Sequence, residues 1–194
     1  CRRCPLAVLI VGGTILRGAA VAAGSIFIVV IAGCSGHSSG KTGTSAPPSL
    51  SAPSLSGPEL VKQQVLDAYR GMWTAYVEAS NNGATAPASL TAYAADSALS
   101  TLNKGLTNNQ ARGVSTKGNP QMSPTMMSAA PPEAPTSAKI LDCLDDTNWL
   151  LYKPDGQLAD NVPGGRRKVT AQVDLRPQGW RVTLIGVQGV GTCA

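Results

Sequence analysis

Hydrophobic residues recur at steps of three and four between Gly57 and Ala79, a spacing that predicts an amphipathic helix. The apolar positions of this stripe are Val61, Val65, Tyr69, Met72, Trp73, Tyr76 and Val77. The preceding Ser56-Gly57-Pro58-Glu59 has the S-x-x-E form of a capping box, with proline early in the first turn, where its missing N–H costs little. The run Asn81-Asn82-Gly83 is typical of a helix end. We therefore expect a helix from about Gly57 to about Ala79.

Two shorter helices are expected after the first. Ser89 is a candidate N-cap for a short helix that holds Leu90 and Tyr93. Asp96 or Ser97 would begin the third helix. Its apolar face would be formed by Leu99, Leu102 and Leu106.

From Gly113 onward the pattern changes to short extended runs separated by proline and glycine, which is typical of strands. The expected strands span residues 114–117, 121–128, 138–152, 167–175 and 180–189. Apolar and polar residues alternate from Val169 to Leu175, and Arg176-Pro177-Gln178-Gly179 has the composition of a turn, so residues 167–189 should form an antiparallel hairpin. We expect an α+β fold in which three N-terminal helices pack on a curved antiparallel sheet, preceded by a signal helix and a disordered linker.

The N-terminal part of the chain has the pattern of an export signal. Arg2, Arg3 and Arg17 precede a run from Gly18 to Gly33 that contains no charged residue. The length of this run leaves an uncleaved signal anchor or a transmembrane helix as an alternative, because a span needs about 20 apolar residues and Pro5 to Leu16 is apolar too.

The apolar run ends in Ile31, Ala32, Gly33 and Cys34, and it gives way at once to polar and small residues. This ending resembles the lipobox of bacterial lipoproteins, in which the cysteine thiol receives a diacylglyceryl group and the peptide before it is removed. The resemblance implies that Cys34 is lipidated and becomes the first mature residue. It also implies a protein anchored by lipid at the extracytoplasmic face of the cell membrane.

The segment from Ser35 to Gly57 consists almost entirely of Ser, Gly, Pro, Thr and Ala, which cannot bury enough apolar surface to offset conformational entropy. It is interpreted as a tether, and His37, the only histidine, lies in it. The chain thus divides into a signal peptide (1–33), the lipidated cysteine with its tether (34–57) and a single domain (58–194).

The positive charge of the chain belongs largely to the signal. The sequence has 16 Lys and Arg against 11 Asp and Glu, and removal of Arg2, Arg3 and Arg17 leaves 13 against 11, a net charge of about +2. The remaining basic run, Arg166-Arg167-Lys168, is too small for a nucleic-acid footprint. Because it follows Pro163-Gly164-Gly165, we interpret it as a solvated hairpin tip rather than as a ligand site.

Two cysteines, Cys143 and Cys193, remain in the domain once Cys34 is lipidated, and an even pair in an oxidising compartment indicates a disulfide. Cys1 and Cys4 have the spacing of half a zinc site or of a redox pair. No second pair completes four zinc ligands, and the following residues lack the strand–helix context of a thioredoxin-like motif. We expect this segment to belong to the discarded n-region or to lie upstream of the true start.

Several segments of the domain resemble uncharacterised actinobacterial secreted proteins and lipoproteins. They are the helix from Tyr69 to Tyr76, Asp142-Cys143-Leu144-Asp145-Asp146-Thr147-Asn148-Trp149, Pro163-Gly164-Gly165-Arg166-Arg167, Gly179-Trp180-Arg181-Val182 and Gly189-Val190-Gly191-Thr192-Cys193. Over roughly residues 58 to 194 the layout is similar to the cone-shaped fold of nuclear transport factor 2 and ketosteroid isomerase. The resemblance implies a cone-like domain, but a fold of this kind does not decide the function.

An isomerase or cyclase of this fold would need a carboxylate base and a Tyr or Asp donor inside an apolar cone. The candidates are Asp142, Asp145 and Asp146 with Tyr69, Tyr76, Tyr93 and Tyr152. Ordinary roles fit them equally, because acidic residues beside Thr147 and Asn148 are typical of a polar turn and tyrosines at helical spacing are typical of a core. The domain has no histidine for a catalytic triad and no zinc or phosphate-loop pattern, so we expect no metal and no cofactor.

The competing class is a non-catalytic domain that binds a small apolar ligand in the cone or a protein partner in the cell envelope. Its pocket would be lined by Tyr69, Trp73, Tyr76, Trp149, Asp142 and Asp145. A deep cavity in which Asp142 or Asp145 faces a tyrosine would favour an enzyme, whereas a filled cone would favour a surface for a partner or for self-association. We expect a binding or accessory domain.

Overall fold

The computed structural model describes residues 56–193. The expected lipidation site Cys34, the lipobox residues before it, the tether up to Leu55 and the Cys1/Cys4 pair lie outside the described residues. Among the helices of residues 56–193, none is long and apolar enough to cross a lipid bilayer.

Three helices form the first half of the domain: α1 (Gly57–Asn81), α2 (Ala88–Thr91) and α3 (Asp96–Ala111). The apolar stripe of α1 is buried as its spacing predicts, but the capping box is not formed, because the side chain of Ser56 makes no capping hydrogen bond. The expected cap at Ser89 is also wrong: α2 begins at Ala88 with Pro87 in the cap position. Sequence periodicity thus located the helices better than it identified their caps.

Six strands follow: β1 (Ser115–Gly118), β2 (Thr125–Ala130), β3 (Ser137–Asp145), β4 (Trp149–Tyr152), β5 (Arg166–Arg176) and β6 (Gly179–Val190). Four of them form an antiparallel sheet in the order β2-β3-β5-β6, and β1 pairs with β4 in a separate two-stranded sheet. The expected hairpin is present as β5 and β6. The fold is α+β, but its strands form two antiparallel sheets rather than the expected single one.

The expected strand 138–152 is divided into β3 and β4 by a turn. Asp145 closes β3 by exchanging backbone hydrogen bonds with Gln121, and the N–H of Trp149 donates to the carbonyl of Asp146 at 2.9 Å. The chain therefore leaves the four-stranded sheet and continues beside β1. Gly118 is required at this crossing, because it has a φ of +89° and a Cβ there would lie 1.8 Å from the carbonyl oxygen of Asn148.

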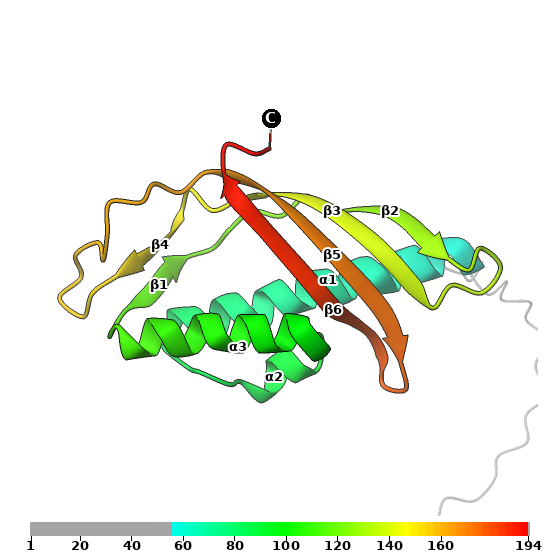
Figure 1. Cartoon of the computed structure of the whole chain (residues 1–194), viewed down its shortest axis with the longest axis horizontal. Helices are drawn as coiled ribbons and strands as arrows, with labels where there is room; N and C mark the ends of the chain where they lie inside the picture. Colours follow the sequence, from blue (N-terminus) through cyan, green and yellow to red (C-terminus); the bar gives the residue numbers. More distant parts are fainter. Residues whose placement is uncertain (1–55, 194) are drawn as a thin grey trace, which may run out of the picture. The chain divides into compact units, whose positions relative to one another are not determined.

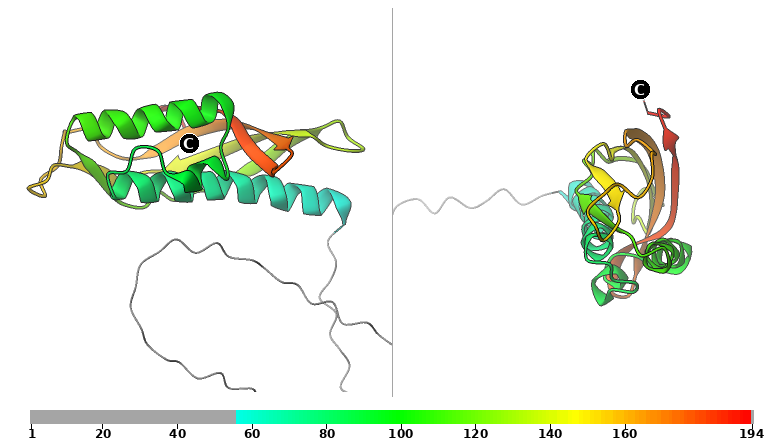
Figure 2. Two further views of the ribbon diagram at one scale, coloured as in Figure 1. Left: turned by 90° about the horizontal axis from the view of Figure 1, so that it is seen from below. Right: turned by 90° about the vertical axis from the view of Figure 1, so that its left-hand side faces the viewer.

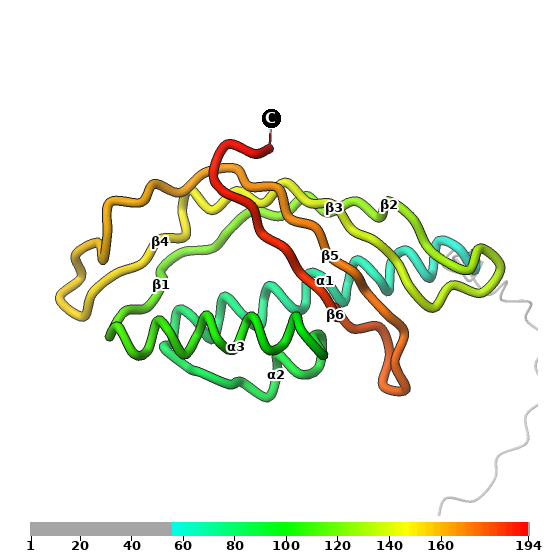
Figure 3. Tube along the Cα trace, in the orientation of Figure 1, coloured from blue at the N-terminus to red at the C-terminus, as the bar shows by residue number. Residues whose placement is uncertain are grey.

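The helices lie on one side of the four-stranded sheet, with α1 behind the strands and α3 alongside β6 in Figure 1. The two views of Figure 2 show the curved sheet closing over the helices, and Figure 3 traces the long loop that returns from β4 to β5. The core is continuous between helices and sheet. Its largest buried apolar side chains include Met72, Leu90, Leu106, Leu144, Val169 and Val182.

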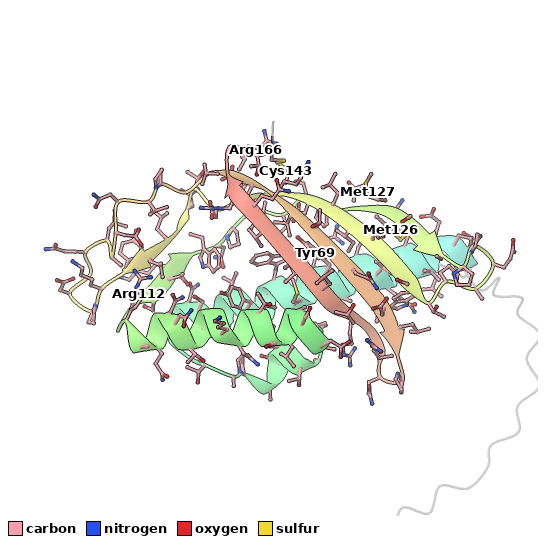
Figure 4. The ribbon with its side chains drawn as sticks, in the orientation of Figure 1. Tyr69, Arg112, Met126, Met127, Cys143 and Arg166 are labelled. Atoms are coloured by element: carbon pink, nitrogen blue, oxygen red, sulfur yellow. A yellow bond between two sulfur atoms is a disulfide. The ribbon has the colours of Figure 1, made fainter. Side chains whose placement is uncertain are left out.

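A polar contact lies inside this apolar core. The hydroxyl of Tyr69, on α1, donates to Oδ2 of Asp142 on β3 at 2.9 Å, and the backbone N–H of Ser123 donates to Oδ1 at 2.7 Å. The two side chains are 0% and 1% exposed, respectively. Figure 4 shows Tyr69 between α1 and the sheet. Since a buried charge is costly unless it is hydrogen-bonded, this contact fixes how α1 is seated on β3.

The expected disulfide is present, with Cys143 of β3 bonded to Cys193 beyond the end of β6. Figure 4 shows Cys143 close to the C-terminal end of the chain. The two cysteines are 50 residues apart, so the bond closes a long loop that contains β4, β5 and β6.

Replacing both cysteines with serine should lower the free energy of unfolding by up to about 4 kcal/mol, because the unfolded chain regains the entropy of a loop of this length. Urea denaturation of the oxidised wild type, the reduced wild type and Cys143→Ser/Cys193→Ser measures the loss. The reduced wild type serves as the control and should match the double variant. A loss below about 1 kcal/mol would show that the bond contributes little.

Tyr69→Phe should lower the free energy of unfolding by about 2 kcal/mol, because it leaves a buried carboxylate without one of its donors. Tyr93→Phe is the matched control, since Tyr93 is exposed and its ring lies against Gly71 of α1. The control should change stability by less than about 0.5 kcal/mol. Equal effects of the two substitutions in urea denaturation would argue against a structural role for the Tyr69–Asp142 contact.

Candidate functional site

A cavity of about 300 Å³ opens at the end of the domain where the two-stranded sheet meets α1, α3 and the start of β5. The residues of its wall that carry chemistry are Tyr76, Asn109, Thr116, Asp146, Trp149 and Arg167. We call it the Arg167 cavity. In Figure 4 the labelled Arg112 marks the end of α3 beside this part of the fold. Its size is at the lower end of the range for small-molecule sites.

Aromatic rings form one wall of the Arg167 cavity. Trp73, Tyr76 and Trp149 contact one another edge to face, with ring centroids 5.9 to 6.3 Å apart. The side chain of Asn81, at the end of α1, fixes this wall because its Oδ1 accepts the indole N–H of Trp149 at 3.3 Å and the hydroxyl of Thr116 at 2.6 Å. The wall is therefore a rigid apolar surface that is connected to α1, β1 and β4.

Tyr76 reaches across from α1 to α3. A Cβ at Gly105 would lie 2.6 Å from the Tyr76 hydroxyl, so glycine at this position of α3 leaves room for the tip of the ring. Burial raises the pKa of the Tyr76 hydroxyl, which keeps it neutral at physiological pH. Within residues 56–193 this hydroxyl has no hydrogen-bond partner, and the Tyr76 side chain lines the cavity.

An ion pair forms another part of the cavity wall. Nε of Arg167 donates to Oδ2 of Asp146 at 2.6 Å, and the backbone N–H of Gly165 donates to Oδ1 at 2.7 Å. The side chains of Arg167 and Asp146 are 21% and 13% exposed. Gly164 makes this contact possible, because a Cβ there would lie 2.4 Å from the carbonyl oxygen of Asp146.

The expectation that Arg166, Arg167 and Lys168 form a solvated hairpin tip is wrong. All three belong to β5, and the side chain of Arg167 faces the cavity through its bond to Asp146. Pro163-Gly164-Gly165 does not turn the chain back on itself but passes close to the Asp146 turn. The signal that sequence reasoning missed was the pair of consecutive glycines before an arginine, which is typical of a close backbone approach.

Five of the six expected pocket residues are distributed over three places, and Asp145 lies in none of them. Tyr76 and Trp149 line the Arg167 cavity, and Trp73 lies behind them and borders a separate depression of about 350 Å³ beside Asn119 and Met122. Tyr69 and Asp142 face each other in the packed core.

Asp145 lies outside all of these places. Its carboxylate accepts the hydroxyl and the backbone N–H of Thr147 at 2.6 and 3.0 Å, so it caps its own turn. These two hydrogen bonds lower the pKa of Asp145.

Tyr69 and Asp142 are residue types that acid–base sites use, but a substrate has no access to them. Burial, and after it the Asp142 carboxylate, raise the pKa of the Tyr69 hydroxyl, so Tyr69 is a neutral donor. Neither Tyr69 nor Asp142 lines any of the five best-formed cavities of residues 56–193, and both side chains are buried. Over the same residues, no three His, Cys, Asp or Glu side chains gather as metal ligands would.

No family model matches the sequence, and no curated protein matches it at a significant level. Similar solved structures include the intermembrane space region of the chloroplast protein ARC6, which has 10% sequence identity and a TM-score of 0.48 over 71% of this chain and 99% of that chain. Another is a proposed aromatic ring hydroxylase from Novosphingobium aromaticivorans, with 13% identity and a TM-score of 0.42 over 65% of this chain and 88% of that chain. With scores and identities this low, neither likeness carries an argument about what this chain does.

Proposed function

We propose that this protein is a lipid-anchored, extracytoplasmic binding protein whose domain holds a small, largely apolar molecule in the Arg167 cavity without transforming it. The observation that carries the proposal is the cavity itself. It combines a rigid aromatic wall with a few polar groups that converge on the same space, which is the usual composition of a small-molecule site.

The geometry favours binding over catalysis. A general base must reach the proton that it removes, with a pKa suited to the task. Both oxygens of Asp146 already accept hydrogen bonds, from Gly165 and Arg167, and Asp142 is enclosed with Tyr69. An isomerase or cyclase, the second candidate, would require the core around Tyr69 to open for its substrate.

The anchor in this proposal rests on the sequence around Cys34. The apolar run before the cysteine and the small, polar residues after it match the order of a lipoprotein signal and tether. The disulfide between Cys143 and Cys193 is consistent with an oxidising compartment outside the cytoplasm.

Ligand binding can be tested with the neutral aromatic fragment naphthamide, followed by NMR. We expect saturable shifts at the backbone N–H of Gly165 and at the indole N–H of Trp149. Asn109→Trp should weaken binding at least about tenfold, equivalent to about 1.4 kcal/mol, because the new side chain fills the cavity from α3.

Asn108→Trp is the matched control for this experiment, since Asn108 is the adjacent, exposed residue of α3. It should leave binding unchanged. If neither naphthamide nor the corresponding acid shifts these two groups in a saturable way, the proposed binding function is wrong.

Anchoring can be tested in the full chain expressed in a bacterial host that processes lipoproteins. The wild type should partition into detergent and carry the mass of an acylated N-terminal cysteine, whereas Cys34→Ala should lose both properties because the acceptor thiol is absent. Cys1→Ala/Cys4→Ala is the control and should behave as the wild type. Unchanged mass and partitioning of Cys34→Ala would refute the anchor and leave the binding function of the domain standing.

A further inference from the structure

We propose that the ligand of the Arg167 cavity is a small organic carboxylate, whose apolar body lies against Trp149 and whose carboxylate accepts hydrogen bonds from Arg167. This inference rests on the proposed binding function and names the chemical class of ligand for the same cavity. It follows from the hydrogen-bonding capacity that the cavity wall has left unused.

Arg167 supplies unused donors. A guanidinium carries five N–H donors in a planar fork, and within residues 56–193 Arg167 uses only Nε, on Asp146. Its two Nη groups have no partner there, although the side chain is largely removed from solvent. The two Nη groups of a guanidinium match the two oxygens of a carboxylate, which gives a strong and oriented pair.

Donors of the protein already occupy part of the accepting capacity of the acidic residues in the cavity. Asp146 accepts from Gly165 and Arg167 through both oxygens. Asp160 accepts the N–H of Val162 at 3.2 Å and lies 3.6 Å from the guanidinium of Arg112. Among the wall residues, Arg167 therefore has the most unused donors, and the Tyr76 hydroxyl, which can donate or accept, has no partner within residues 56–193. A ligand that complements them must present acceptors.

The charge and the apolar surface of the cavity wall indicate which kind of ligand with hydrogen-bond acceptors fits best. Among the described residues that line the cavity, Arg167 is the one cation and it is paired with Asp146, so Asp146 and Asp160 would repel a doubly charged phosphate more than a monocarboxylate. Trp149, Leu150 and Val162 give the wall an apolar surface that a fully polar ion would leave unfilled. A monocarboxylate with one or two rings fits the charge, the surface and the volume of about 300 Å³.

The test compares naphthoate with its neutral counterpart naphthamide, which has the same ring system. Binding to the folded protein is measured by isothermal calorimetry and located by the NMR signals of Gly165 and Trp149. We expect naphthoate to bind about tenfold more tightly than naphthamide, since a charge-assisted pair is worth more than a neutral hydrogen bond.

Two substitutions in the ion pair should act in opposite directions. Arg167→Gln should remove the preference for naphthoate, because the fork and its charge are lost. Asp146→Asn can still accept the N–H of Gly165 through its amide oxygen but removes the negative charge next to the site, so it should tighten naphthoate binding about threefold relative to naphthamide. Arg176→Gln is the control, since Arg176 lies at the other end of β5 and pairs with Asp96.

Several outcomes would overturn the assignment. Equal affinities of naphthoate and naphthamide for the wild type would refute it while the binding function stands, and so would a preference that survives in Arg167→Gln. If Arg167→Gln does not fold, weaker naphthoate binding by Asp146→Asn decides against the proposal. Failure of both compounds to bind at Gly165 and Trp149 would remove the binding function and this inference together.

Discussion

The carboxylate of Asp146 connects the parts of the fold on which the cavity depends. It accepts the N–H of Gly165 and the guanidinium of Arg167, and its own backbone carbonyl accepts the N–H of Trp149. The first two bonds tie the turn after β3 to the start of β5, and the third starts β4 in a new direction. Together with the cap that Asp145 forms on Thr147, these contacts divide residues 138–152 into β3 and β4.

Two acidic residues of β3 and its following turn thus have different roles, although they lie only four positions apart. Asp142 points into the core and meets Tyr69, where it contributes to the seating of α1. Asp146 lies at the edge of the core, where part of its partner Arg167 remains accessible. Environment rather than residue type separates the two roles, because only the second carboxylate lies beside a space that a molecule can enter.

The spacing of hydrophobic residues along the sequence predicted those helices and strands that are determined by contacts between residues close together in the chain. The stripe from Val61 to Val77 gave α1, and the alternation from Val169 to Leu175 gave the β5–β6 hairpin, because burial follows the periods of helix and strand. The end of β3 and the role of Arg167 were missed because the contact between Asp146 and Arg167 joins residues 21 positions apart. Of the six expected pocket residues, Tyr76 and Trp149 line the cavity with Arg167, whereas Tyr69 and Asp142 are buried in the core beneath α1.

The disulfide lies close to the exposed edge of the four-stranded sheet and restrains it. β6 is an edge strand, and its first half is covered because Val182 exchanges backbone hydrogen bonds with Tyr93 and Ala95. The second half, from Gly186 to Val190, is exposed and has no such cover among the described residues. An uncovered strand edge has unpaired N–H and C=O groups that can form hydrogen bonds with other chains. Because Cys193 lies three residues beyond the end of β6, its covalent link to β3 restrains the part of this strand that is most able to separate from the sheet.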